Sequence, residues 1–251
     1  MLTEPLVPEP TRGRVFRAER SVRLSDADPD ARLRLDACAR YLHDVSNDDT
    51  RDADLPDDGS WVVRRTIIDV VEPPRLLERV SVATWCGGVG SRWAERRVSV
   101  NGVKGSRVET ASLWVYVDLT SMMPKRLTSG FEERYGEAAG GRQVGSKLLL
   151  PAPGDPGLPS RRWPLRRADL DVLGHVNNAA YWTAVEELLG DRPDLIGGPY
   201  RAVVEFAKPI APGSEVALLV DDGGAGADLR CWFRVDGVVH ASALVRPATP
   251  R

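Results

Sequence analysis

The chain has 251 residues, of which 42% are hydrophobic and 28% are charged, and its formal net charge is −2. This length is enough for one large domain or two small ones, each with a buried core. The balanced charge gives no reason to expect nucleic acid as a partner. The cysteines are odd in number and far apart, which predicts neither a disulfide framework nor a zinc site and favours a reducing compartment; they are Cys38, Cys86 and Cys231.

The N-terminal segment, residues 1–13, carries two glutamates and three prolines and has no apolar run. Its composition is therefore not that of a signal peptide. No stretch of the chain approaches the roughly 20 apolar residues that a membrane helix needs. We expect a cytoplasmic protein that has no contact with a membrane.

A helix is predicted near the start of the chain, directly after the element Asp26-Ala27-Asp28. Four apolar residues there fall at helical spacing, and they are Leu35, Ala39, Leu42 and Val45. The acid-rich run that follows, residues 44–58, is interpreted as a solvated loop. Further on, Asn101-Gly102 stands between two extended runs, which is typical of a two-residue hairpin. Three nearby arginines are interpreted as the outward face of a strand, and they are Arg92, Arg96 and Arg97.

Residues 138–160 are dense in glycine and proline and have no lasting periodicity, which is typical of a linker. This linker separates two predicted domains, 14–137 and 161–247. The domains repeat each other: IIDVVEPPRLLERVSV, from Ile67, matches VVEFAKPIAPGSEVAL, from Val203, at a constant offset of 136 positions. Each copy reads as two strands with a proline-marked break between them.

The neighbours of the two copies also agree. Asp236-Gly237 matches the first hairpin signal, and Asp169-Leu170-Asp171 precedes a second helical stretch with Tyr181, Val185 and Leu188. Each half therefore reads as one strand, one helix and about four strands. A helix against an antiparallel sheet, present twice, is an α+β fold.

The segment ADLDVLGHVNNAAYWTAVEE, from Ala168, carries the residues best suited to chemistry. Asp171 stands just before the second helix, where it could act as a nucleophile or as a general base. Gly174 permits a tight approach to the helix start, whose N–H groups lack intrahelical partners and suit an acyl oxyanion. His175 could orient water or donate to a carbonyl. Together these groups fit the hydrolysis of a thioester.

Plainer structural roles are open for the same residues. An aspartate before a helix is commonly an N-cap, and His175 could serve packing alone. Asn177 and Asn178 stand at the helix start, where they could cap the helix or contact a substrate. Asp169 is interpreted as a turn residue.

The pattern Asp-x-x-Gly-His-Val-Asn-Asn-x-x-Tyr that begins at Asp171 resembles the signature of hot-dog thioesterases. With the first-half segment 61–85, it resembles the double hot-dog acyl-ACP thioesterases, over about residues 15–245. The resemblance implies a tandem hot-dog fold, each unit a central helix wrapped by an antiparallel sheet. It also implies hydrolysis of fatty acyl-ACP or acyl-CoA in fatty acid biosynthesis, with no cofactor and no metal ion, through Asp171, His175 and Gly174.

The first half lacks this motif, since no Gly-His pair follows Asp28. By the same resemblance, it is expected to form the acyl-chain pocket between its helix, around Ala39, and strands near Trp61 and Trp85. The two sheets are expected to join as in a hot-dog dimer. The protein would then be a monomeric pseudo-dimer or a homodimer.

Four arginines just ahead of the motif form a basic cluster, and they are Arg161, Arg162, Arg166 and Arg167. Acyl carrier protein is acidic and CoA carries phosphates, so the cluster suits docking of either carrier. A solvated strand edge is the alternative interpretation.

The motif departs from the plant-type pattern at two positions. Leu173 stands where that pattern has Asn, and no carboxylate occupies the place near Pro209 where it has Glu. The site therefore looks more like that of the simpler acyl-CoA hot-dog thioesterases. Two alternatives stay open. One is a hot-dog dehydratase or hydratase, whose acid-base arrangement is not found here, and the other is a non-catalytic acyl-binding module.

Overall fold

The computed structural model describes residues 4–55, 59–155 and 157–248. The strands in these ranges are β1 (Val15–Ser21), β2 (Ser60–Glu72), β3 (Arg79–Val89), β4 (Trp93–Gly102), β5 (Arg107–Val117), β6 (Ser160–Trp163), β7 (Tyr200–Phe206), β8 (Val216–Asp221), β9 (Leu229–Val235) and β10 (Val238–Pro247). The helices are α1 (Leu35–Asp52), α2 (Ser129–Ala139), α3 (Asn178–Gly190) and α4 (Pro193–Ile196). Short 3₁₀ turns, Leu24–Asp26 and Arg167–Asp169, precede α1 and α3.

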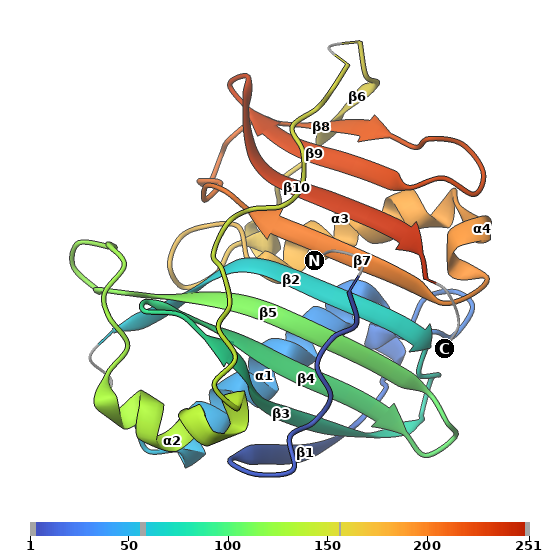
Figure 1. The fold of residues 1–251 in the computed structure, drawn as a ribbon. Helices are drawn as coiled ribbons and strands as arrows, with labels where there is room; N and C mark the ends of the chain where they lie inside the picture. Colours follow the sequence, from blue (N-terminus) through green and yellow to red (C-terminus); the bar gives the residue numbers. More distant parts are fainter. Residues whose placement is uncertain (1–3, 56–58, 156, 249–251) are drawn as a thin grey trace.

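All ten strands join in one antiparallel sheet (Figure 1), in the order β1-β3-β4-β5-β2-β7-β10-β9-β8-β6. Each half contributes its strands in the same order, outward from the centre. The sheet therefore has an internal two-fold relation, with β2 and β7 at the middle. This arrangement confirms the expected α+β tandem hot-dog fold, in which two helix-wrapped units join along one sheet.

The central pair of strands carries this symmetry in its register. Ile67 lies opposite Val203, the residue 136 positions later that the sequence repeat matches to it. Two ion pairs flank this point. They are equivalent in the repeat, because the offset of 136 positions relates the acid of one pair to the acid of the other and the arginine of one to the arginine of the other. They are Asp69–Arg201, with Oδ1 and Nε 2.5 Å apart, and Arg65–Glu205, with Nη1 and Oε1 3.3 Å apart. Both cross from β2 to β7, so they fix the register between the halves.

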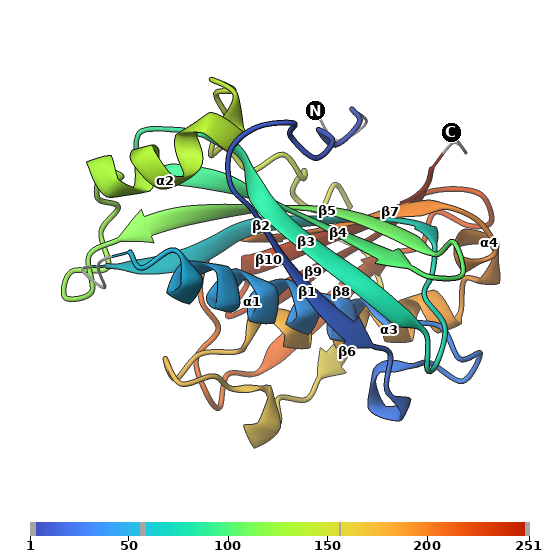
Figure 2. The same cartoon turned by 90° about the horizontal axis from the view of Figure 1, so that it is seen from below.

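The two long helices pack against each other on one face of the sheet (Figure 2). The apolar residues that predicted them are buried in one shared core, Leu35, Ala39, Leu42 and Val45 from α1 and Tyr181, Val185 and Leu188 from α3. This confirms both helical predictions. In the described part of the chain, no helix combines the length and the apolar character needed to cross a bilayer.

The opposite face of the sheet is crossed by residues 4–14 and by residues 140–155, as Figure 1 shows. Leu6 and Leu150 cover a small apolar cluster at the middle of the sheet, which includes Ile67 and Val203. The backbone N–H of Leu150 donates to the Glu205 carboxylate at 2.8 Å. These contacts hold the connection between the halves flat against the sheet.

The two hairpin signals differ in outcome. Asp236 and Gly237 both have positive φ, 48° and 80°, and join β9 to β10 as a two-residue turn, as predicted. At Asn101-Gly102 the prediction is wrong, because β4 continues through both residues and the chain reverses over 103–106. The buried Glu78 carboxylate, which accepts from the Lys104 N–H at 3.1 Å, stabilises this longer loop.

The loop prediction for the acid-rich run is wrong for residues 44–52, which are the second half of α1, while residues 56–58 of the run lie outside the described residues. Asp49 is fully buried there, and Arg14 and Arg96 neutralise it. Arg96 and Arg97 therefore do not lie on an outward strand face, whereas Arg92 is exposed. Helix α2 was not predicted either.

One contact joins the start of α1 to the body of α3. The Glu186 carboxylate of α3 accepts a hydrogen bond from the Leu35 N–H, the first of α1. Burial raises the pKa of Glu186 to about 7, and the nearby Asp36 and Asp28 act in the same direction. The Leu35 N–H opposes this shift, and so does Arg34.

A raised carboxyl pKa predicts the pH dependence of stability. Between the unfolded value of 4.5 and the folded value of about 7, the folded state binds more protons at Glu186, so stability falls as pH rises. Glu186→Gln removes this cost and keeps the acceptor for Leu35. We expect the variant to match wild type at pH 4.5 and to be more stable at pH 8, by on the order of 2 kcal/mol. Thermal unfolding at both pH values measures this, with the exposed Glu187→Gln as control, and equal stability at pH 8 would contradict it.

Candidate active site

Two loops, one in each half, lead into α1 and α3 with the same hydrogen bonds. In the first, the Asp26 carboxylate accepts from the Arg23 N–H at 3.1 Å, and in the second, the Asp169 carboxylate accepts from the Arg166 N–H at 2.7 Å. Both aspartates are buried. Asp169 is therefore a turn residue, as predicted, and the residues after it define the site.

Each loop turns through one residue in the left-handed region. Gly174 has a φ of 74°, and its N–H donates to the Asp171 carbonyl at 3.1 Å. At the same place in the first half, Ala31 has a φ of 62° and donates to the Asp28 carbonyl at 2.9 Å. This conformation costs a non-glycine residue about 1–2 kcal/mol. Gly174 thus relieves strain at the turn, and its amide is already engaged.

The carboxylate of Asp171 is oriented by the backbone of its own loop. Its Oδ1 accepts from the Leu173 N–H at 2.9 Å and from the His175 N–H at 3.4 Å. Within the described residues, Oδ2 has no hydrogen-bond partner and the carboxylate has no ion pair. The side chain is half-buried, so one oxygen is fixed while the other is free to meet a ligand or water.

The corresponding carboxylate of the first half is neutralised. Asp28 Oδ1 accepts from the Arg32 N–H at 2.7 Å, and Oδ2 pairs with the Arg32 Nε at 2.9 Å. Arg32 stands where the second half has His175. The same backbone frame therefore holds an arginine-paired aspartate in one half and an unpaired aspartate in the other.

The backbone donors expected at the start of α3 are largely occupied, which corrects the sequence prediction. The Val176 N–H donates to the Ile210 carbonyl at 3.0 Å, and the Asn177 N–H to the Asp169 carbonyl at 2.7 Å. The Ala179 N–H donates at 2.8 Å to the side chain of Asn177, which is the N-cap of the helix. These amides serve the turn and the cap, whereas the Asn178 N–H, the first of the helix, has no partner among the described residues.

The remaining motif positions lie near the surface. Asn178 is the first residue of α3, and both it and His175 are half-buried. Leu173 is 59% exposed, so the position that departs from the plant-type pattern points away from the core. At the second departure, the Pro209 carbonyl accepts from His240 Nδ1 at 2.9 Å. Glu205 holds the linker and Arg65, as described above, and is not available to the site.

The basic cluster ahead of the motif divides in two. Arg166 pairs with Asp169 at 2.7 Å, and this hydrogen bond raises its pKa, so Arg166 serves the turn. Arg161 and Arg162 lie on the edge strand β6 and are exposed, as is Arg167. These three make no ion pair within the described part of the chain.

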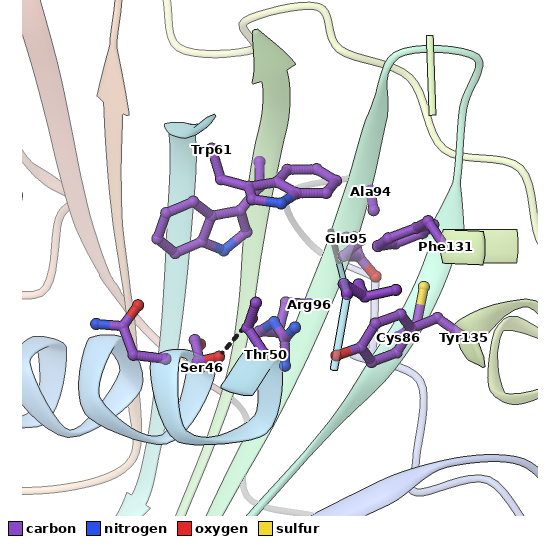
Figure 3. A pocket seen from close by; sticks show the side chains of 12 residues that line it. Ser46, Thr50, Trp61, Cys86, Ala94, Glu95, Arg96, Phe131 and Tyr135 are labelled. Atoms are coloured by element: carbon purple, nitrogen blue, oxygen red, sulfur yellow. Dashed lines mark hydrogen bonds between the residues drawn. The ribbon is translucent and has the colours of Figure 1, made fainter. Parts of the chain in front are cut away.

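A cavity of about 70 Å³ lies in the first half, between the C-terminal part of α1, α2 and the sheet (Figure 3). Four aromatic residues line it, Trp61, Trp114, Phe131 and Tyr135, together with polar residues such as Glu95 and Arg96. An outer groove of about 520 Å³ adjoins it and shares Trp61 and Phe131. Ala39 and Trp85 are buried but do not line this cavity, so of the predicted pocket residues only Trp61 does.

The inner end of the cavity is a polar cluster that sequence reasoning missed. Asp49 Oδ2 accepts from Arg96 Nη1 at 2.5 Å and from the Tyr135 hydroxyl at 2.9 Å, while Oδ1 accepts from Arg14 Nε at 2.7 Å. These residues are 35 to 86 positions from Asp49 in sequence. The sequence carried one sign of this cluster: residues 44–52 continue the helical spacing of Leu42 and Val45.

The cysteines offer no second reaction centre. Burial raises the pKa of both Cys38 and Cys231 to about 12, and it also raises that of Cys86. All three thiols are buried and unpaired. Among the described residues, no group of three or more His, Cys, Asp or Glu side chains could hold a metal ion.

Solved structures resemble this chain over nearly its full length. The 12:0-ACP thioesterase from Umbellularia californica has a TM-score of 0.76 and 20% sequence identity, covering 94% of this chain and 97% of that one. An acyl-ACP thioesterase from Bacteroides thetaiotaomicron has a TM-score of 0.74 and 18% identity, covering 92% and 97%. At these identities the likeness concerns the fold.

The sequence comparisons identify the family. An uncharacterized protein of Mycobacterium tuberculosis is 34% identical over 242 residues, covering 96% of this chain and 95% of that protein. The model of the acyl-ACP thioesterase N-terminal domain matches residues 13–135, and that of the C-terminal domain matches residues 159–243. The chain therefore belongs to the acyl-ACP thioesterase family and is a thioester hydrolase.

Proposed function

We propose that this protein hydrolyses acyl-ACP at Asp171, with the acyl group held in the first-half cavity. The observation that carries the proposal is the contrast between the two loops. Asp28 is paired with Arg32, whereas Asp171 has one oxygen fixed by backbone donors and no ion pair within the described residues. A carboxylate that is oriented but not neutralised is suited to act as a base.

In the proposed reaction, Asp171 Oδ2 takes a proton from a water molecule whose oxygen attacks the thioester carbonyl carbon. The carbonyl π electrons move to oxygen, giving a tetrahedral oxyanion. When this intermediate collapses, the C–S bond breaks, and the thiolate of the carrier leaves and takes up the proton held by Asp171, which regenerates the base. His175, directly after the turn, is proposed to assist by orienting the water, and Gly174 by holding the turn.

The acyl group is proposed to enter the first half. The cavity lies beside α1, which runs along α3, and four of the twelve residues that line it are aromatic. A cavity of about 150 Å³ holds a benzene ring, so the inner cavity of about 70 Å³ is too small for a fatty chain. A longer chain would have to pass Trp61 and Phe131 into the outer groove.

The carrier is proposed to dock on the arginines of β6. Arg161, Arg162 and Arg167 are exposed and have no ion pair within the described residues, which suits the acidic surface of acyl carrier protein. The exposed Val172 and Leu173 adjoin them at the tip of the loop. The two domains, 14–137 and 161–247, would then divide the work into acyl binding and hydrolysis. We further propose that the reaction belongs to cytoplasmic fatty acid biosynthesis.

Asp171→Asn tests the catalytic assignment. Asparagine keeps the Oδ1 acceptor for the Leu173 N–H but cannot take a proton, so we expect kcat to fall roughly 10³-fold with little change in KM. Steady-state hydrolysis of acyl-ACP and acyl-CoA of several chain lengths measures both constants. The matched control is Asp28→Asn in the first-half loop, which should leave kcat unchanged. If Asp171→Asn were folded and fully active, the assignment would be wrong.

Ala94→Leu tests the acyl cavity. Ala94 is buried and lines the cavity, so the larger side chain occupies space that about two methylene groups would fill. At about 0.8 kcal/mol per buried methylene, kcat/KM for long chains should fall roughly tenfold relative to short ones. Ala227→Leu, in the second half and outside this cavity, is the control. A chain-length profile that Ala94→Leu leaves unchanged would move the acyl site elsewhere.

Reversing two charges on β6 tests the carrier surface. Arg161→Glu combined with Arg162→Glu should lower kcat/KM for acyl-ACP by roughly tenfold or more, and the loss should shrink at high salt. The same substitutions should barely affect an acyl-N-acetylcysteamine thioester, which carries neither protein nor phosphate. An equal loss on both substrates would show that the arginines do not recognise the carrier.

A further inference from the structure

Two aromatic rings of the first half that carry N–H groups lie together. The ring of His43, on α1, meets that of Trp114, on β5, edge to face, with centroids 5.9 Å apart. Within the described residues, Trp114 Nε1 is buried without a hydrogen-bond partner, and no hydrogen bond of the His43 ring is found. A buried donor that lacks a partner is costly and uncommon, which indicates an acceptor that arrives from outside.

The internal symmetry brings His43 to the Asp171 loop. The residues of the two loops and the following helices correspond at an offset of 143 positions, from Asp26 and Asp169 onward. By this offset His43 is the counterpart of Glu186, which contacts the start of α1 through the Leu35 N–H. The equivalent position on α1 therefore faces the start of α3, where the Asp171 loop lies.

Electrostatics agree with this placement. Burial lowers the pKa of His43, and Asp44 and Asp171 oppose the shift, so the Asp171 carboxylate acts directly on this ring. A histidine that burial keeps neutral has one N–H to donate and holds it at neutral pH.

The two symmetry-related sites share an aspartate and differ at the other two positions. The first-half site gathers the acidic residues Asp28 and Glu186 and the cationic Arg32, whose charges compensate one another in part. The second-half site gathers Asp171, His175 and His43. A neutral donor thus replaces the buried acid that would repel a developing negative charge.

The reaction needs such donors, and three amides of the loop are already engaged. The amides of Leu173, Gly174 and His175 all donate to Asp171, as described above. Trp114 lines the acyl cavity, and its neighbour His43 is within electrostatic reach of Asp171. The two N–H groups therefore lie where the path from the reacting carboxylate to the acyl cavity begins.

We propose that His43 and Trp114 Nε1 donate hydrogen bonds to the thioester carbonyl oxygen and stabilise the oxyanion during hydrolysis at Asp171. This inference rests on the proposed function. Both donors keep their protons throughout, while the proton of the water passes to Asp171 and the C–S bond breaks. The active site is then composite, with its base from the second half and its oxyanion donors from the first.

Trp114→Phe keeps an aromatic ring and removes the N–H. Losing one preorganised oxyanion donor lowers kcat by 10²–10³-fold, so we expect a loss of about 10²-fold with KM within threefold of wild type. His43→Leu should behave alike, and His43→Gln, whose amide can donate, should recover most of the loss. The matched control is Trp232→Phe, since Trp232 Nε1 donates to the Pro151 carbonyl at 2.9 Å and should affect stability alone.

Binding of two unreactive analogues provides a second readout that does not depend on turnover. A ketone analogue, with CH₂ in place of sulfur, keeps the carbonyl, whereas a thioether analogue lacks it. Trp114→Phe and His43→Leu should weaken binding of the ketone about tenfold and leave the thioether unchanged. Melting curves identify any variant that fails to fold. In that case the result for the remaining variant tests the inference.

Two results would overturn the inference alone: kcat within threefold of wild type in both variants while Asp171→Asn is inactive, or a rise in KM with kcat unchanged. Equal weakening of the binding of both analogues would likewise show that His43 and Trp114 only line the cavity. If the wild-type protein hydrolysed no acyl thioester, the proposed function would fail first and the inference with it.

Discussion

The antiparallel pairing of β2 with β7 determines the rest of the molecule. Its register sets Ile67 opposite Val203, and the mirrored ion pairs Asp69–Arg201 and Arg65–Glu205 lock that register from both sides. A slip of one residue would turn every side chain of β7 to the other face of the sheet. Because the pairing makes one sheet of two units, α1 and α3 must share one face and pack against each other. Each helix thereby reaches the loop that precedes the other.

The two loops share a backbone but differ in their side chains, which is why a single active site is proposed for a repeated fold. Both halves keep the same turn, with a left-handed residue at Ala31 or Gly174 and an aspartate hydrogen-bonded to its own loop. In the first half, Arg32 neutralises that aspartate, so the loop serves stability. In the second half, no ion pair to Asp171 occurs within the described residues, and its carboxylate keeps an oxygen for chemistry. The backbone is the same in both loops, and two differences in side chain separate their proposed roles. They are Ala31 against Gly174 and Arg32 against His175.

The sequence predicted what short-range patterns encode. Both long helices, the Asp236-Gly237 turn and the motif around Asp171 depend on short spacings, and the repeat on a constant offset of 136 positions; the structure contains each of these elements. Asp49 was misjudged because the partners that neutralise it, Arg14, Arg96 and Tyr135, are distant in sequence. Helix α2 carried local signals, the N-cap Thr128 and the left-handed Gly140, but little apolar periodicity. The cavity exists only where these distant parts meet.

The cavity lies in the half without the motif for a structural reason. Helix α1 has 18 residues and α3 has 13, so α1 continues past the symmetric part of the pair. Its last turns and α2 enclose a space beside β2, β4 and β5, and among the described residues of the second half no helix corresponds to α2. Asp171, the proposed base, lies in the loop that leads into α3. In the proposed reaction an acyl thioester reaches from this loop to the cavity across the junction of the halves, where His43 and Trp114 are proposed to meet its carbonyl.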